Sequence, residues 1–295
     1  MKTKMLIVVL ISVGLFLTAG AQDYEFKVLV TKGKNELKAG AAWNALKVGA
    51  SLKKTDEIRI GSNSYLGLIH SSGKPLEIKD AKTYKVSDLA ERIKSGPSVL
   101  NKYTDFIISA NTQKNNKLTA TGAVHRGENT IRVFLPKTEL AYAYGDSITI
   151  QWEKEKAAPP YVVTFTTFFG DELYKTETNA TSVTINLNDV AFRSENEFQV
   201  HVFSKKDRKE SEEYVIRKLK KEERARVKPL LGDVLNQTKE NTAINKLWQA
   251  GFFEKEKLYI DAATAWQKAV KLEPGLQEQY DDFLLRNGMN DPKKK

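Results

Sequence analysis

The sequence predicts a protein of several domains, in which two all-β parts precede a helical part. Short strand-like runs separated by glycines dominate residues 24–95, and period-two alternation of apolar residues recurs between 118 and 218. Beyond 218 the apolar residues fall at helical spacing. A chain of 295 residues is long enough for two or three such units. The predicted order is a small β module (24–95), a connector helix (96–117), a β-sandwich (118–218) and an α-helical bundle (219–295).

The first 21 residues have the three-part pattern of a secretory signal peptide. Lys2 and Lys4 precede an apolar run from Met5 to Leu17, and small residues at Ala19 and Ala21 favour cleavage after Ala21. The alternative is an uncleaved anchor, but the apolar run is shorter than the roughly 20 residues that span a bilayer. We expect an exported protein, periplasmic or secreted, with no membrane span after cleavage.

Composition excludes several kinds of chemistry. The chain has no cysteine and three histidines, so disulfides and thiolate metal sites are impossible and a histidine-rich metal centre is not expected. The net charge is +10, yet the lysines of the densest stretch, 204–228, alternate with acids, so we predict no nucleic-acid partner. No phosphate-binding, zinc-protease or nucleophile-elbow motif occurs. We therefore predict no catalytic residue, no cofactor and no metal.

One local grouping could resemble a nucleophile and its base. His70 precedes Ser71 and Ser72, but no acid that would orient the imidazole is evident in the sequence. We favour the tip of a β-hairpin at this place.

The first β module is predicted from strands punctuated by glycines. The expected strands are Phe26–Thr31, Glu57–Ile60, Tyr65–His70, Pro75–Lys79 and Thr83–Val86. Regular short strands of this kind favour a small sandwich or barrel.

The order of residues in this module resembles the FecR domain, the extracytoplasmic part of iron-transport signalling regulators. The resemblance is carried by Trp43-Asn44-Ala45-Leu46, Gly49, Leu52, Asp56 before Ile58, Ser64-Tyr65-Leu66-Gly67-Leu68, Ser71-Ser72-Gly73 and Leu76-Glu77-Ile78. Thr55 departs from the family's usual glycine, and His70-Ser71-Ser72 replaces its usual Asp-Gly turn. We expect neither the sigma-factor-binding segment nor the membrane helix of such regulators ahead of the module. The resemblance therefore implies a fold and a partner-sensing theme, with Trp43 and Gly73 as structural residues.

The connector is predicted as a helix with one apolar stripe. After the break at Gly96-Pro97, one helical face carries Val99, Leu100, Tyr103, Phe106, Ile107 and Ala110. We expect the stripe to pack on the first module or to bridge to the second. A partner-binding helix is the alternative.

The second β part is predicted as an antiparallel sandwich. Its expected strands are Thr130–Leu135, Ser147–Trp152, Tyr161–Phe168, Ser182–Leu187, Asn196–Phe203 and Glu213–Arg217. The segments around Pro159-Pro160, Thr181–Leu187 and Asn196–Val202 resemble fibronectin type III or immunoglobulin-like domains. Trp152 is interpreted as a core residue, with an exposed sugar platform as the alternative.

The helical region carries a pattern that resembles one tetratricopeptide repeat. Its small, aromatic and proline positions are Ala250, Phe253, Ala262, Trp266, Ala269 and Pro274. Small residues let two antiparallel helices approach closely, aromatic residues fill the space between them, and Pro274 stops the second helix. Segments 219–238 and 276–286 are expected to complete a small bundle.

These observations favour an exported, non-enzymatic envelope protein that acts as a protein–protein interaction scaffold or sensor. The expected partner is another envelope protein, contacted through the helical groove or the edge of the sandwich. Units of the tetratricopeptide kind commonly bind peptides or proteins, so Phe253, Trp266 and Tyr280 are the candidate contact residues. The alternative is a glycan- or peptidoglycan-binding module that uses Trp43 or Trp152. The sequence predicts no oligomeric state.

Overall fold

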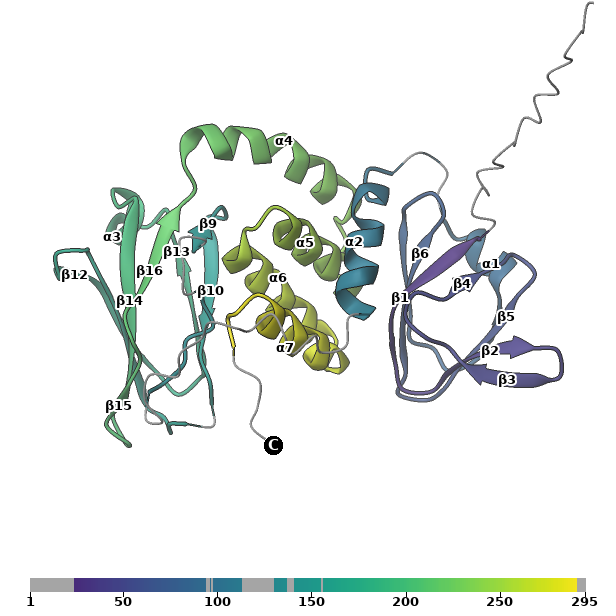
Figure 1. Cartoon of the computed structure of the whole chain (residues 1–295), viewed down its shortest axis with the longest axis horizontal. Coiled ribbons are helices and arrows are strands. Elements are labelled where there is room, and N and C mark those ends of the chain that lie inside the picture. Colours follow the sequence, from purple (N-terminus) through teal and green to yellow (C-terminus); the bar gives the residue numbers. More distant parts are fainter. Residues whose placement is uncertain are drawn as a thin grey trace, which may run out of the picture.

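The computed structural model describes residues 24–93, 96, 98–112, 130–136, 141–154 and 156–290. It is a multi-domain β-plus-α protein, as the sequence predicts. Figure 1 places a β module at one end, a β-sandwich at the other end and the C-terminal helices between them. The order of the parts in space therefore differs from their order along the chain. The predicted signal peptide, 1–21, lies outside the described residues.

The first module consists of two four-stranded antiparallel sheets. The first sheet has the order β4-β1-β6-β7, with β4 Ser51–Leu52, β1 Phe26–Lys32, β6 Tyr65–His70 and β7 Pro75–Ile78. The second has the order β3-β2-β5-β8, with β3 Ala42–Ala45, β2 Asn35–Ala39, β5 Glu57–Ile60 and β8 Thr83–Lys85. Helix α1 (Val86–Ala90) follows. The sheets enclose one apolar core that contains Phe26, Leu52 and Ile58.

The sandwich combines a large sheet with a two-stranded one. The large sheet has the order β12-β11-β14-β16-β9, with β12 Glu172–Thr178, β11 Tyr161–Thr166, β14 Glu197–Ser204, β16 Tyr214–Lys218 and β9 Tyr142–Ala143, and β15 Lys209–Glu210 pairs with β14. The small sheet pairs β10 (Ser147–Gln151) with β13 (Ser182–Asn186), and helix α3 (Val190–Arg193) packs near β12. Trp152 is 1% exposed and meets the Tyr161 ring edge-on, so it is a core residue.

One predicted strand of the sandwich is wrong. Residues 130–135 do not form a ladder, and only isolated bridges join Ile131 to Ser211 and Val133 to Trp152. The apolar alternation remains meaningful, because Ile131, Val133 and Leu135 are all buried in the sandwich core. Burial of alternate side chains is thus achieved here without continuous backbone pairing.

Within the described part of the chain, five helices and one 3-10 turn form the helical unit. They are α2 (Asn101–Thr112), α4 (Lys221–Gln237), α5 (Ala243–Lys255), α6 (Tyr259–Leu272), η1 (Pro274–Leu276) and α7 (Gln277–Arg286). Thr242 is the N-cap of α5, and its side-chain oxygen accepts the Asn245 backbone N–H. Helix α6 ends at Leu272, and Pro274 opens the 3-10 turn that follows.

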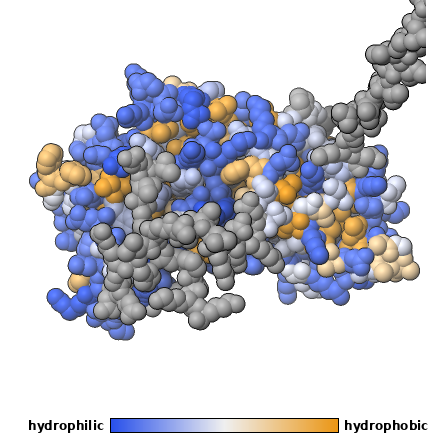
Figure 2. Space-filling view, in the orientation of Figure 1, coloured by the Kyte–Doolittle hydropathy of each residue, from blue (hydrophilic) through white to orange (hydrophobic). Residues whose placement is uncertain are grey.

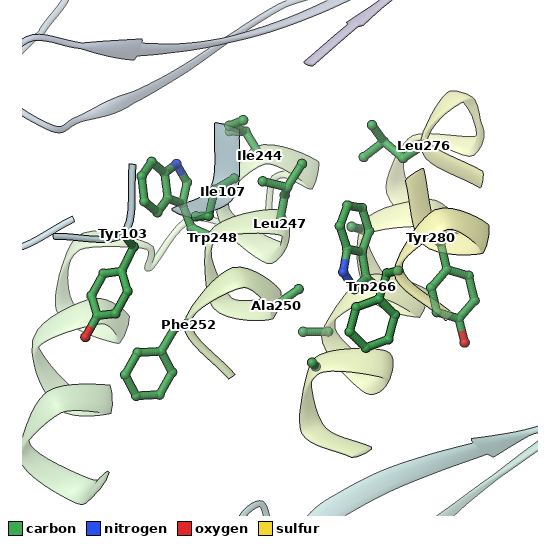
Figure 3. Packing of buried hydrophobic residues seen from close by; sticks show 14 of the residues in the cluster. Tyr103, Ile107, Ile244, Leu247, Trp248, Ala250, Phe252, Trp266, Leu276 and Tyr280 are labelled. Carbon is green, nitrogen blue, oxygen red and sulfur yellow. The ribbon is translucent and has the colours of Figure 1, made fainter. Parts of the chain in front are cut away.

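Helix α2 packs on the first module, as expected, and it also has a partner that was not expected. Tyr103 of α2 meets Phe252 of α5 edge-on at 5.5 Å between ring centroids, and Ile107 lies against Gly251 (Figure 3). The helix also contacts β1. The predicted connector is therefore a member of the C-terminal helical core, contributed from the middle of the chain.

The core of the helical unit is continuous with one face of the first module. One cluster of buried residues joins Leu29 and Tyr65 of the β1–β6 pair to Tyr103, Trp248 and Trp266 of the helices. Ile260 of α6 belongs to the sandwich core. The helices therefore fill the space between the two β parts and share a core with each of them.

Candidate interaction surface

The three predicted contact residues of the helical unit are used inside the molecule. Trp266 and Tyr280 are 2% and 1% exposed, and Phe253 is half-buried against the Tyr144 ring. The Tyr280 hydroxyl donates to Gln151 Oε1 at 2.8 Å and accepts from Gln267 Nε2 at 3.1 Å. Burial raises the pKa of Tyr280. The interior that such helices would offer to a peptide is occupied by the protein's own β parts.

Four of the predicted structural residues lie where two segments of the backbone pack closely against each other. Ala250, Ala262 and Ala269 are fully buried in the helical core. Gly73 has φ +86°, and a Cβ there would lie 2.5 Å from Asn101 Oδ1, so the β6–β7 turn and the start of α2 require glycine at this place.

Two carboxylates fasten the helical unit to the β parts. Asp261, fully buried at the start of α6, accepts the backbone N–H groups of Tyr144 and Gly145, both at 2.7 Å. Burial raises the pKa of Asp261 to about 6, although these hydrogen bonds and the nearby Arg224 oppose the shift. Arg224 also binds the same turn, through Tyr144 O and through Asp146.

Glu77 of β7 makes the corresponding joint on the other side. It accepts from the Tyr65 hydroxyl at 3.0 Å and from the Ile244 backbone N–H at 3.2 Å, in the first turn of α5. Burial and the Glu77 charge raise the pKa of Tyr65. In both joints a carboxylate of one part therefore accepts backbone N–H groups of another.

The structure adds a carboxylate to the His70 grouping. His70 Nε2 lies 2.9 Å from Glu25 Oε1, and Nδ1 lies 2.7 Å from Ser72 Oγ. The Ser72 backbone N–H also donates to Nδ1, at 3.1 Å, so the imidazole closes the β6–β7 turn. Phe26 packs edge-on against the ring at 5.1 Å. This arrangement holds the hairpin that the sequence predicts, and the lack of a catalytic residue stays a prediction.

The most exposed aromatic pair of the described residues lies at the turn between β11 and β12. Phe169 is 92% exposed and Phe168 is 61% exposed, with their rings 6.4 Å apart. We call these two residues the aromatic tip. Figure 2 shows an apolar patch at the outer end of the sandwich, where this hairpin turns. Scattered apolar residues are normal on a surface, but two adjacent phenylalanines at a protruding turn are typical of a contact site.

Hydrogen bonds hold the turn that carries the aromatic tip. Thr167 N–H donates to Asp171 O at 2.8 Å, and the Thr167 hydroxyl oxygen accepts the backbone N–H groups of Phe169 and Asp171. Gly170 supplies φ +94°, which other residues rarely adopt. The tip is thus presented on a defined turn, and its backbone has little freedom left to lose on binding.

Neither the aromatic tip nor strand β12 was predicted from the sequence. A signal was available: Phe168-Phe169-Gly170-Asp171 places two aromatics directly before turn residues. Adjacent residues of a strand face opposite sides of a sheet, so two successive phenylalanines cannot both enter the same core. At least one had to be exposed or in a turn.

Trp43 forms a second surface feature, on the second sheet of the first module. It is half-buried, and the Arg59 guanidinium lies 4.4 Å from its ring centroid, with Lys38 Nζ at 5.8 Å. Glu36 and Glu57 pair with these two cations. The face therefore joins an indole to several hydrogen-bonding groups.

Within the described ranges, no helix is long and apolar enough to cross a bilayer. In the same residues no group of three or more histidine or acidic side chains could hold a metal ion.

Comparison with known proteins gives only a distant likeness. No protein-family model and no curated protein matches the sequence. Among solved structures, the chain is similar to PorZ, described as an essential bacterial surface component of the type-IX secretion system of Porphyromonas gingivalis, with 13% sequence identity and a TM-score of 0.24. The match covers 62% of this chain and 24% of PorZ, so the chain matches about a quarter of that protein's length.

Proposed function

We propose that this protein is an exported, non-enzymatic envelope protein that acts as a protein–protein interaction scaffold. In this proposal the aromatic tip, which lies at the edge of this protein's sandwich, enters an apolar groove on another envelope protein. The observation that carries the proposal is the exposure of Phe168 and Phe169 on a hydrogen-bonded turn. Export rests on the pattern of residues 1–21.

Burial of the aromatic tip would contribute binding energy to a contact of this kind. Burial of a phenylalanine side chain contributes about 1.5–3 kcal/mol. Two neighbouring rings of this type are therefore able to act as the central residues of a small interface. The resemblances to the FecR, immunoglobulin-like and tetratricopeptide families support the same class of function, since these modules commonly bind other proteins.

The helical unit has a different part in this proposal from the one that the sequence favours. Its aromatic residues fill the interior, so it serves as a spacer that sets the two β parts at a fixed separation. Contacts with a partner are then made by the outer ends of the molecule.

The test compares a double substitution at the tip with a matched control. Phe168→Ser with Phe169→Ser removes both rings from exposed positions, and Leu235→Ser removes a 42% exposed leucine from α4. We expect the double variant to lose crosslinking to its envelope partner in the producing cell, with an unchanged unfolding midpoint, and the control to retain it. Equal crosslinking in both variants contradicts the proposal. Recovery of the full-length chain with residues 1–21 intact from the soluble cytosol contradicts the proposed export.

A second candidate function is glycan or peptidoglycan binding through Trp43. The observation that favours it is the half-buried indole beside Arg59 and Lys38 on an outward sheet face. Trp152 offers no such platform, because it is buried. Binding to purified cell-wall polymer that is lost in Trp43→Ala and retained in the Phe168/Phe169 variant supports this function. Binding that is unchanged in Trp43→Ala contradicts it.

A further inference from the structure

Strand β12 is an edge strand whose outer side has no backbone partner in the described sheet. It stands first in the order β12-β11-β14-β16-β9, and with seven residues it is the longest edge strand that the structure describes. Exposed edges of this length offer a template for another strand, and proteins commonly protect them with charged residues or cover them.

The direction of the backbone groups follows from the neighbouring strand. Lys205 N–H donates to Pro160 O on the β14 side of β11. Successive residues of a strand alternate in the neighbour that they face, so Tyr161 and Val163 face β12. Their partners Thr178 and Thr176 face β11 in return. The intervening residues 175 and 177 therefore direct their N–H and C=O groups to the open edge.

The charges on this edge are self-complementary. Lys175 and Glu177 lie two residues apart, so their side chains are on the same face of the strand. If a second β12 pairs antiparallel about a two-fold axis at Thr176, Lys175 of each copy lies opposite Glu177 of the other. Opposite charges in direct cross-strand positions stabilise a pair of strands.

The neighbouring registers are less favourable. An axis at Lys175 places the two Lys175 ammonium groups opposite each other. An axis at Tyr174 places Asp171 opposite Glu177. Like charges in these positions destabilise the pairing, so charge favours the register about Thr176 over these two.

The existing ion pairs on the strand do not oppose this pairing. Lys175 lies 3.5 Å from Glu172, and Glu177 pairs with Lys205, but all four side chains are about half exposed. Exposed pairs of this kind contribute little to folding, so their exchange for pairs between copies is of low cost.

We propose that two copies of this chain associate through antiparallel pairing of their β12 strands in the register about Thr176. The core of the sandwich need not change, because only edge groups are used. The dimer presents two aromatic tips, one at each end of the paired strands. This inference goes beyond the proposed function and does not depend on which protein the tip contacts.

The test is a set of charge exchanges read by sedimentation and light scattering on the purified mature chain. Lys175→Glu alone and Glu177→Lys alone each create two like-charge contacts in the dimer, so we expect each to weaken self-association at least about tenfold. An equimolar mixture of these two variants restores opposite charges at both contacts, and so does the double exchange in one chain. Both should dimerise as the unchanged protein does.

Lys228→Glu makes the same change in net charge as Lys175→Glu at an exposed position on α4, and it should leave the dimer unchanged. A protein that is monomeric at a concentration on the order of 0.1 mM overturns the proposal. Single exchanges without effect, or a mixture that fails to associate, overturn it as well. Because this measurement uses purified protein, its failure is distinct from loss of crosslinking at the aromatic tip.

Discussion

Asp261→Asn should change the way in which stability depends on pH. Asp261 is fully buried at the joint between α6 and the turn after β9, and burial raises its pKa from 3.8 to about 6. A group whose pKa is raised by folding stabilises the fold below its unfolded pKa, and this contribution is lost as pH rises through the folded pKa. Each pKa unit corresponds to about 1.4 kcal/mol, so the free energy of unfolding should fall by about 2–3 kcal/mol between pH 4 and pH 7 on account of this group.

The asparagine variant separates the charge from the hydrogen bonds. The asparagine side chain would have one acceptor oxygen, whereas Asp261 accepts from both Tyr144 N–H and Gly145 N–H. One backbone donor then faces an amide nitrogen, at a cost of about 1–3 kcal/mol. At pH 4 only this loss remains, so the variant is less stable than the unchanged protein. At pH 7 removal of the buried charge offsets the loss, and the two proteins should differ little.

Urea unfolding at several pH values between 4 and 7 measures both effects. The difference between the two proteins isolates position 261, because all other residues are common to both, including the Arg224–Asp146 ion pair beside the joint. A difference in unfolding free energy that is constant across this range refutes the argument, as does a greater destabilisation at pH 7 than at pH 4.

Three further substitutions test the packing and the second joint. Gly251→Ala places a Cβ 2.5 Å from Ile107 Cγ1 and should cost about 1–3 kcal/mol in unfolding free energy; adding Ile107→Ala should recover part of it, and strictly additive effects in the double variant speak against this contact. Gly73→Ala should destabilise more than Gly40→Ala, because both glycines have positive φ but only Gly73 also meets Asn101; thermal unfolding compares them, and equal losses contradict the steric argument. Glu77→Ala leaves the Tyr65 hydroxyl and the Ile244 N–H without their acceptor, so chemical denaturation should show a loss of about 1–3 kcal/mol per unpaired group, and an unchanged midpoint disproves the joint.

Local periodicity was enough to predict many of the elements. Glu57–Ile60 and Tyr65–His70 are strands with the predicted bounds, and two helices follow the spacing from Ala250 to Ala269. These segments have strong apolar patterns because one or both of their faces are buried in a core. Residues 130–135 have the same alternation without a ladder, which shows that the pattern reports burial rather than backbone pairing.

The interaction surface was less accessible from the sequence. Strand β12, Glu-Leu-Tyr-Lys-Thr-Glu-Thr, has little apolar alternation because it lies at an edge and is exposed along much of its length. The joints at Asp261 and Glu77 connect residues that are more than 100 positions apart, and no local pattern specifies such a pairing. The pattern of a single repeat predicts Trp266 and Tyr280 as contact residues, because it gives no indication that β parts of the same chain fill the groove.

The position of the helices between the β parts has a consequence for biogenesis. The β1–β6 face and the β10 strand are covered by α5 and α6. Both helices are synthesised after the two β parts, so these apolar surfaces remain exposed to solvent until α5 and α6 have been made. A truncated product that ends before α5 would retain two β parts with uncovered apolar surfaces and would be a ready substrate for chaperones and proteases. Only a chain that includes α5 and α6 would therefore bury the apolar surfaces of both β parts and escape degradation.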